Sequence, residues 1–155
     1  MHLLDNNNNL SESEIQFLYQ THPYLIDRRF LDKIAIPQYP LPSGFADLVI
    51  LLEDEIVVIE LKVEPLQFTH YLQLREYIGD IKQIYKKKKK YQGILIGYQP
   101  IDNFDTIYRS KDFDFKVLML EEDICTRIKI CDNCRLANDR KNKKCFNCSS
   151  DKFLR

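Results

Sequence analysis

The chain has 155 residues, 45% of them hydrophobic, and its 23 Lys and Arg residues balance its 23 Asp and Glu residues. Such a chain can hold one domain of ordinary size and a small appendage. It has no apolar run near the length of a membrane span, and Met1 leads into an asparagine tract at residues 6–9 rather than a secretory signal. We therefore expect an intracellular protein, in the cytoplasm, nucleoid or nucleus, with no membrane partner.

The neutral total hides a division of charge along the chain. Residues 1–124 hold 14 Lys and Arg against 20 Asp and Glu, a net −6, whereas residues 125–155 hold 9 against 3, a net +6. All five cysteines also lie after residue 124, and four of them form two Cys-x-x-Cys pairs. In a reducing compartment this spacing favours metal binding over disulfides.

The first predicted element is a helix that follows a disordered lead-in at residues 1–11. Ser11 or Ser13 can cap it, and Glu14 stands three residues after Ser11 as in a capping box. Pro23 ends the helix, because proline disfavours α geometry in the residue before it. The apolar residues at helical spacing are Ile15, Leu18 and Tyr19.

A hairpin is predicted next, after a short edge-like strand at residues 33–39, where neighbouring prolines are tolerated only at a sheet edge. The stretch GFADLVILLEDEIVVIELK is typical of two β-branched apolar runs joined at Glu53 and Asp54. If these two residues form the turn, Asp47 lies directly opposite Glu60.

Three charged side chains are therefore expected to meet on one face of this hairpin. Side chains alternate along a strand, so Glu60 and Lys62 share the face that Leu61 does not. Buried charges cost several kcal/mol each, to an order of magnitude, unless something pairs with them. Oxygens of Asp47 and Glu60, the Leu61 carbonyl and water would suit Mg²⁺ or Mn²⁺, and Lys62 could orient or deprotonate a water. The alternative is a buried ion pair without chemistry, but the grouping of perturbed charges favours a catalytic site.

A long amphipathic helix is predicted over residues 68–86, after Pro65 breaks the chain. Within it Gln73 and Tyr77 lie one turn apart and project from the same face. They could brace the site or touch nucleic acid, and the alternative is ordinary helix surface. The apolar stripe of this helix comprises Tyr71, Leu74, Ile78, Ile81 and Tyr85.

Five consecutive lysines follow, and two interpretations of them stay open. Such a run is often only a solvated helix end, where cations suit the helix dipole. At the edge of the sheet near the predicted site, it would instead attract a phosphate backbone. These residues are Lys86, Lys87, Lys88, Lys89 and Lys90.

The remaining elements of this part complete a mixed α/β sheet. Residues 91–98 are predicted to form a buried strand that joins the sheet through a right-handed crossover. Residues 102–110 are predicted to form a short helix and residues 115–120 a last strand. The order helix, three strands, helix, strand is typical of an α/β domain, which we place at residues 12–124.

The cysteine tail, residues 125–155, is predicted to be a zinc ribbon. Two Cys-x-x-Cys knuckles present four thiolates, which match tetrahedral Zn²⁺. With few large apolar residues, the tail would draw most of its folding energy from the metal. The ligands would be Cys131, Cys134, Cys145 and Cys148, while Cys125 is expected to be a spare buried thiol. The basic residues that would offset the thiolates and contact nucleic acid are Arg135, Arg140, Lys141, Lys143 and Lys144.

The pattern Gly-x-x-Asp, hairpin, Glu60-Leu61-Lys62 resembles the PD-(D/E)XK nuclease superfamily, closest to its RecB-like and NucS-like branches. The resemblance implies a restriction-endonuclease-like core of αβββαβ order, with Asp47 and Glu60 holding Mg²⁺. It also implies that a Glu of the first helix reaches the metal, either Glu14 or Glu12, and it gives Gln73 and Tyr77 the places of a Gln-x-x-x-Tyr motif near the site. Iron–sulfur relatives take one Cys from upstream of the core, where this chain has none, so zinc is favoured.

The tail resembles a RanBP2-type zinc finger, in which Asn138 fits the pattern between the two knuckles. Lys129 stands where that family usually has Trp, and Arg135-Leu136 replaces Thr-Phe, which disfavours ubiquitin binding. The charge of the tail favours nucleic acid as its partner, and a purely structural lid is the alternative.

These features together predict a Mg²⁺-dependent nuclease that acts on DNA, with a zinc ribbon that aids binding. The alternatives are a catalytically inactive module that binds nucleic acid or protein, and a nuclease for RNA. A homodimer or larger complex is one way for so short a chain to shape a groove. The histidines His2, His22 and His70 show no ligand spacing and receive no role.

Overall fold

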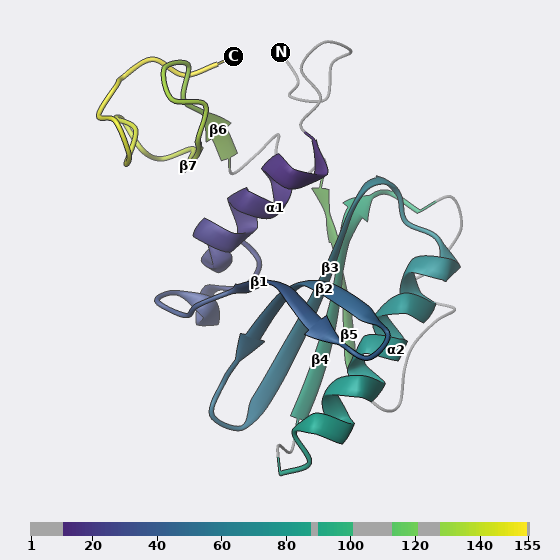
Figure 1. The fold of residues 1–155 in the computed structure, drawn as a ribbon. Coiled ribbons are helices and arrows are strands. Elements are labelled where there is room, and N and C mark those ends of the chain that lie inside the picture. Colours follow the sequence, from purple (N-terminus) through teal and green to yellow (C-terminus); the bar gives the residue numbers. More distant parts are fainter. Residues whose placement is uncertain (1–10, 88–89, 101–112, 121–127, 155) are drawn as a thin grey trace.

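The computed structural model describes residues 11–87, 90–100, 113–120 and 128–154. Figure 1 shows a central sheet with a helix on each side and a small C-terminal unit beside the first helix. The elements in chain order are α1 (Glu12–Thr21), the 3₁₀ turns η1 (Pro23–Leu25) and η2 (Arg28–Phe30), β1 (Ile36–Leu41), β2 (Gly44–Leu51), β3 (Glu55–Pro65), α2 (Phe68–Ile84), β4 (Lys90–Tyr98), β5 (Asp114–Met119), β6 (Ile128–Ile130) and β7 (Ala137–Asp139).

The main sheet is mixed, as the sequence predicts. Its strands lie in the order β1-β2-β3-β4-β5, with β1, β2 and β3 antiparallel and β3, β4 and β5 parallel. Short loops can join only antiparallel neighbours, whereas the long connection through α2 carries the chain back to a parallel position. The strands β6 and β7 form a separate two-stranded sheet in the tail.

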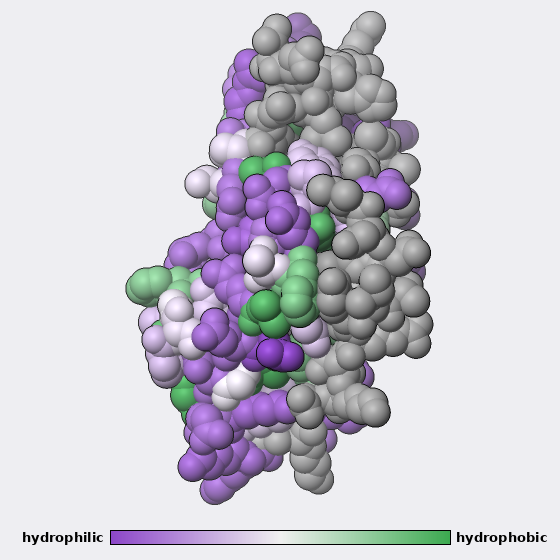
Figure 2. Space-filling model, turned by 90° about the vertical axis from the view of Figure 1, so that its right-hand side faces the viewer, coloured by the Kyte–Doolittle hydropathy of each residue, from purple (hydrophilic) through white to green (hydrophobic). Residues whose placement is uncertain are grey.

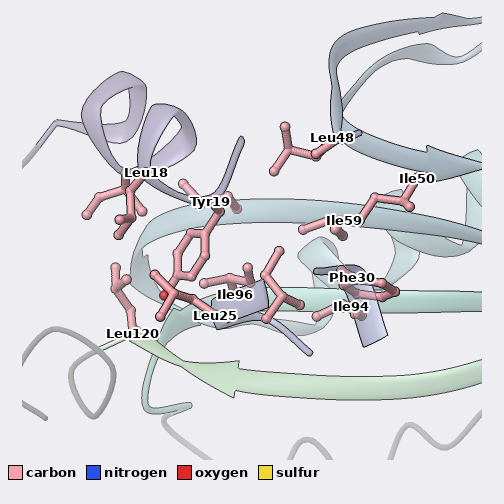
Figure 3. Close-up of a cluster of buried hydrophobic side chains, with 14 of the residues drawn as sticks. Leu18, Tyr19, Leu25, Phe30, Leu48, Ile50, Ile59, Ile94, Ile96 and Leu120 are labelled. Atoms are coloured by element: carbon pink, nitrogen blue, oxygen red, sulfur yellow. The ribbon is translucent and has the colours of Figure 1, made fainter. Parts of the chain in front are cut away.

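Two apolar cores lie on opposite faces of the main sheet. On one face α1 and the turns after it cover alternate residues of the central strands, as the cluster in Figure 3 shows. On the other face α2 covers the residues in between. The first core includes Leu18, Tyr19, Phe30, Leu48, Ile50, Ile59, Ile94, Ile96 and Leu120, and the second includes Val49, Val58, Leu74, Ile78, Ile81 and Leu95.

The predicted signals for α1 and for the edge strand are present. Ser11 Oγ accepts a hydrogen bond from the backbone N–H of Glu14, and its hydroxyl donates to Glu14 Oε1, so Ser11 caps the helix and its side chain pairs with that of Glu14. Strand β1 lies at the edge of the sheet, where the missing N–H groups of Pro37 and Pro40 are tolerated. The turn of the hairpin also forms, because Leu52 N donates to Glu55 O at 2.8 Å.

Element ends differ from the prediction by one to three residues. Helix α2 ends at Ile84 rather than residue 86, because Tyr85 leaves helical geometry while its N–H still bonds Ile81 O. Strand β1 starts three residues later than predicted, and β4 and β5 each start one residue earlier. Residues 1–10 of the lead-in predicted at 1–11, the short helix predicted at 102–110, and Cys125 lie outside the described residues.

The tail packs onto the main domain through apolar contacts with the α1 side of the sheet. Ile128 and Ile130 are buried in the same core cluster as Ile15 and Leu18 of α1. The Phe146 ring meets the His22 ring edge-on, with centroids 5.0 Å apart. The tail and α1 therefore share one hydrophobic core.

Among the described residues on the α2 side, hydrophilic surface predominates and hydrophobic side chains gather in small groups (Figure 2). Within the described part of the chain, no helix has the length and apolar character needed to cross a membrane.

Candidate active site

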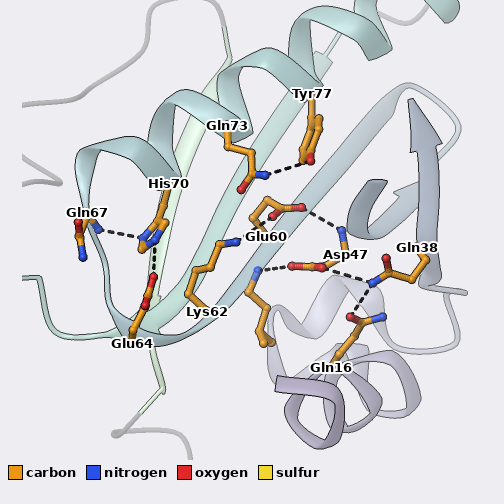
Figure 4. A network of polar contacts seen from close by, with 11 residues as sticks. Gln16, Gln38, Asp47, Glu60, Lys62, Glu64, Gln67, His70, Gln73 and Tyr77 are labelled. Carbon is orange, nitrogen blue, oxygen red and sulfur yellow. Dashed lines mark hydrogen bonds and ion pairs between the residues drawn. The ribbon is translucent and has the colours of Figure 1, made fainter. Parts of the chain in front are cut away.

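The hairpin register brings the two predicted carboxylates together. Leu48 pairs with Ile59, and one further step of the same antiparallel register puts Asp47 opposite Glu60. The backbone N–H of Asp47 donates to Glu60 Oε1 at 2.9 Å, and the N–H of Leu61 donates to Asp47 Oδ2 at 2.8 Å (Figure 4). Each carboxylate is therefore held by the backbone of the opposite strand.

Lys62 lies beside the pair on the same face of β3. Its Nζ is 3.9 Å from Glu60 Oε2, and its side chain is 21% exposed whereas that of Glu60 is 3% exposed. Leu61 faces the opposite core, as strand alternation requires. The ammonium group therefore stands between a buried carboxylate and the solvent.

Burial raises the pKa of both carboxyl groups. Loss of water raises the pKa of Asp47, although the Leu61 N–H and Lys62 oppose that rise. The pKa of Glu60 is raised to about 8, first by burial and then by the neighbouring charge of Asp47. Two carboxylates this close in a poorly solvated place cannot both ionise easily. A proton or a cation must accordingly share the site with them.

The donor set fits a hard divalent cation. Mg²⁺ and Mn²⁺ prefer carboxylate and carbonyl oxygens together with water, and bind through one or two protein carboxylates. Asp47 and Glu60 supply the carboxylates, and their raised pKa values mean that a cation would relieve repulsion already present.

Of the two acidic residues considered on α1, the structure brings Glu12 toward the site. The pKa of Glu12 is raised by burial and then by the charge of Asp47, while Lys62 lowers it. Glu14 instead makes hydrogen bonds with Ser11 at the start of the helix. Glu12 is thus the better placed of the two to face a cation held by Asp47 and Glu60.

Two glutamines that sequence reasoning missed contact this site. Gln38 Nε2 donates to Asp47 Oδ1 at 3.4 Å and to Gln16 Oε1 of α1 at 2.9 Å. No motif in the sequence marks them, because a single glutamine in an edge strand has no characteristic spacing. Only the register of β1 against β2 places Gln38 next to Asp47.

Gln73 and Tyr77 lie on the face of α2 that is turned toward the carboxylates. Gln73 Nε2 donates to Tyr77 Oη at 3.1 Å. The pKa of Tyr77 is raised by burial and then by the charge of Glu60, so the phenol lies within electrostatic reach of the site. The two side chains are neighbours, as their spacing predicts.

His70 has a structural role that its isolated position in the sequence did not indicate. Its Nδ1 accepts from the backbone N–H of Gln67, which completes the cap of α2, and its Nε2 lies 2.8 Å from Glu64 Oε1. Burial lowers the pKa of His70, which favours a neutral ring that donates from Nε2 to Glu64. Glu64 follows Lys62 by two residues on β3, so this pair borders the site (Figure 4).

The last lysine of the run, Lys90, starts strand β4 at the end of the sheet away from the site. Lys90 pairs with Glu55, which precedes Glu60 by five residues on β3. At about 3.3 Å per residue, that separation is roughly 16 Å along the strand. Lys86, Lys87 and Lys90 are exposed there, whereas Lys88 and Lys89 lie outside the described residues.

The four tail cysteines form a compact cluster. The Sγ atoms of Cys131, Cys134, Cys145 and Cys148 all lie within 4.8 Å of one another, and the structure describes them as free rather than disulfide-bonded. Such a set could hold one metal ion, and four sulfurs with two knuckles match zinc.

Polar groups of the tail surround these sulfurs. Asn138 is fully buried, and its amide donates to Leu136 O and Cys145 Sγ, while its Oδ1 accepts from Phe146 N. Burial alone would raise the pKa of the Cys145 thiol, but N–H groups from Cys148, Asn147 and Asn138 lower it to about 6. This environment favours the thiolate form that a metal needs.

Lys129 stands where the zinc finger that the tail resembles usually has Trp, and its side chain makes two contacts within the tail. Its Nζ lies over the Phe153 ring at 3.9 Å from the centroid and donates to Asn142 O. The basic residues of the tail are exposed: Arg135, Arg140, Lys141, Lys143 and Lys144. Of these, Arg140 also donates to Ile128 O at 2.7 Å.

Comparisons with known proteins show what this fold is similar to. No family model matches the chain, and no curated protein matches it. A repair endonuclease from Pyrococcus abyssi is similar in structure, with a TM-score of 0.58 and 23% identity over 72% of this chain and 48% of that chain. An EndoMS–dsDNA complex gives a TM-score of 0.57 and 22% identity over 70% of this chain and 44% of that chain.

EndoMS in its apo form is also similar, with a TM-score of 0.54 and 22% identity over 72% of this chain and 47% of that chain. The chain therefore spans less than half the length of these endonucleases. The likeness establishes the predicted fold class: a mixed α/β sheet domain like that of repair endonucleases, here followed by a four-cysteine cluster.

Proposed function

We propose that the protein is a Mg²⁺- or Mn²⁺-dependent nuclease that hydrolyses phosphodiester bonds in DNA. The observation that carries the proposal is the meeting of Asp47, Glu60 and Lys62 on one buried patch of sheet. Its support from the fold is the likeness to endonucleases, one of which was solved with double-stranded DNA.

In this proposal Asp47 and Glu60 hold the cation, and Glu12 stands near enough to add a third acidic group. When bound, the cation supplies Lewis-acid activation of water and stabilises charge on the phosphate. Lys62 orients the attacking water and offsets the negative charge that develops on the phosphoryl oxygens. Gln73 and Tyr77 brace this face of the site from α2.

The tail supports a second part of the proposal, a zinc ribbon that aids the binding of nucleic acid. Its exposed cations would contact phosphates, an interaction that weakens as salt concentration rises. The exposed lysines Lys86, Lys87 and Lys90 could extend this contact, but their distance from Glu60 makes a direct role in cleavage unnecessary.

Cleavage assays with matched lysine variants test the function. Wild-type protein should degrade labelled DNA only when Mg²⁺ or Mn²⁺ is added, and Lys62→Ala should lower the rate at least 100-fold, because the loss of a positioned acid–base group costs about 10²–10⁴ in rate. Lys33→Ala, which removes an equal charge from an exposed loop, should cleave at the wild-type rate. Equal rates for wild type and Lys62→Ala would remove the mechanism.

The competing function is a binding module with a nuclease fold but no turnover. The basic tail, packed on the domain, is the observation that favours it. Binding of labelled DNA without metal-triggered cleavage on single-stranded, duplex and branched substrates would support it. The same panel with RNA distinguishes a ribonuclease from a deoxyribonuclease.

A further inference from the structure

Gln38 has a backbone conformation that its side-chain type rarely adopts. Its φ is +48°, in the left-handed region. Residues other than glycine, asparagine and aspartate are uncommon there. The other described non-glycine residues with positive φ are Asp32, Arg135 and Ser149, and none of them lies within a strand. Gln38 alone among these four lies within a strand of the main sheet. Strain of this kind persists only where surrounding contacts hold it in place.

The conformation of Gln38 directs its amide toward Asp47. In β1, Pro37 pairs with Leu48 and Tyr39 pairs with Ala46, which leaves Gln38 at the level of Asp47. Its Nε2 reaches Asp47 Oδ1 at 3.4 Å and Gln16 Oε1 at 2.9 Å (Figure 4). An amide nitrogen carries two hydrogens, so both acceptors can be satisfied at once.

The two oxygens of Asp47 are thus held by donors from two different strands. Leu61 N donates to Oδ2 from β3, and Gln38 donates to Oδ1 from β1. A carboxylate with one donor can still rotate about its last side-chain bond, whereas donors to both oxygens fix its plane. The Gln38 amide is neutral, so it orients Asp47 without the positive charge that would compete with a cation.

We propose that Gln38, braced by Gln16 of α1, is a positioning residue that fixes the Asp47 carboxylate in the orientation in which it shares a divalent cation with Glu60. This inference rests on the proposed function, since it assigns a role within the same site. It accounts for why a strained residue is kept in the edge strand next to this carboxylate.

Substitution by glycine separates positioning from ordinary structural support. Gln38→Gly removes the amide and also relieves the left-handed strain, so the protein should melt at or above the wild-type temperature. Its affinity for Mn²⁺, measured by calorimetric titration without DNA, should nevertheless fall roughly tenfold, the effect of losing one hydrogen bond to a charged group. In cleavage assays the Mn²⁺ concentration for half-maximal rate should rise by the same factor.

Asp32→Gly is the matched control. Asp32 has a φ of +64° in an exposed turn outside the site, so glycine relieves the same kind of strain without touching Asp47. This variant should bind Mn²⁺ as the wild type does. Gln16→Ala removes only the brace, leaves β1 unchanged, and should weaken Mn²⁺ binding in the same direction by a smaller factor.

Three results would overturn the inference, and they can be told apart. If the wild type binds Mn²⁺ and Gln38→Gly binds it equally well, the positioning role is wrong while the proposed nuclease site stands. If the wild type shows neither Mn²⁺ binding in this assay nor Mn²⁺-dependent cleavage of DNA, the proposed function fails. The positioning role then fails with it. A Gln38→Gly protein that melts well below wild type would show that the residue is a structural support instead.

Discussion

At the scale of single residues, the site depends on two carboxyl groups that compete for one proton or cation. Glu60 is only 2% exposed and Asp47 8% exposed, and both accept backbone hydrogen bonds from the opposite strand. Side-chain types and strand alternation were enough to predict that these groups meet. The contact of Gln38 with Asp47, and that of Gln16 with Gln38, could not be predicted, because the left-handed backbone of Gln38 has no signature in the sequence.

The raised pKa of Glu60 makes a prediction about metal affinity and pH. Below about pH 8 a cation must displace the proton of Glu60, so Mn²⁺ affinity should rise roughly tenfold per pH unit from pH 6 and level off above pH 8. Calorimetric titration at several pH values measures this slope. A flat profile between pH 6 and pH 8 would mean that the carboxyl group is already ionised without metal.

The same shift predicts how the stability of the metal-free protein varies with pH. The folded pKa of Glu60 is raised to about 8, above its ordinary value of 4.5. Its stabilising contribution is therefore fully present below about pH 4.5 and lost as pH rises through 8, on the order of a few kcal/mol. Denaturant unfolding at pH 6 and pH 9 should show this loss. Glu60→Gln, which cannot ionise, should lose much less, and an equal loss in both proteins would assign the effect to other groups.

The close approach of Gly44 to Tyr77 gives a further prediction at this scale. Its φ is +147°, and a Cβ there would lie 2.8 Å from Tyr77 Oη. Gly44→Ala should therefore displace the Tyr77 ring from the face near Glu60 and lower stability by about 1–3 kcal/mol. Chemical denaturation measures the change. An Ala variant as stable as wild type would show that Tyr77 can move freely.

At the scale of elements, helix α2 contains a glycine that, unlike Gly44, has room for a larger side chain. Gly79 lies within this helix, and a Cβ there meets nothing within 4 Å. Gly79→Ala should stabilise the protein by about 1 kcal/mol, because alanine loses less backbone entropy than glycine when a helix forms. Thermal unfolding checks this, and a lower melting temperature would contradict the helix register described here.

The existence of the elements was more predictable than their surroundings. The hairpin register followed from a two-residue turn and the strand period, and the structure confirms it, with Leu52 N bonded to Glu55 O. The position of the lysine run relative to the site was not predictable, because it depends on which residues of β3 and β4 pair. The choice between Glu12 and Glu14 depended on the direction in which α1 enters, which sequence spacing alone does not specify.

At the scale of the whole molecule, the tail and α1 are packed together, a contact between residues more than 100 positions apart that no local pattern encodes. Ile128 and Ile130 share a core with Ile15 and Leu18, and Cys131 directly follows Ile130. Loss of the metal that we propose for the cysteine cluster should consequently loosen this core as well as the tail.

Cys145→Ser tests that coupling. The variant should unfold at a lower temperature than wild type, because exposing even one buried isoleucine of the shared core costs about 1.5–3 kcal/mol. The double variant Lys143→Gln/Lys144→Gln keeps all four cysteines and should melt as wild type does while binding DNA more weakly. An unchanged melting temperature in Cys145→Ser would show that the cluster holds no structural metal.

The central claim is that Asp47 and Glu60 hold a divalent cation beside Lys62. Anomalous diffraction from crystals soaked in Mn²⁺ tests it most directly, since the signal locates the ion without reference to activity. The account predicts a manganese peak within coordination distance of a carboxylate oxygen from each of Asp47 and Glu60, and no such peak in Asp47→Ala/Glu60→Ala crystals. Wild-type crystals with manganese elsewhere and none at this pair would contradict it.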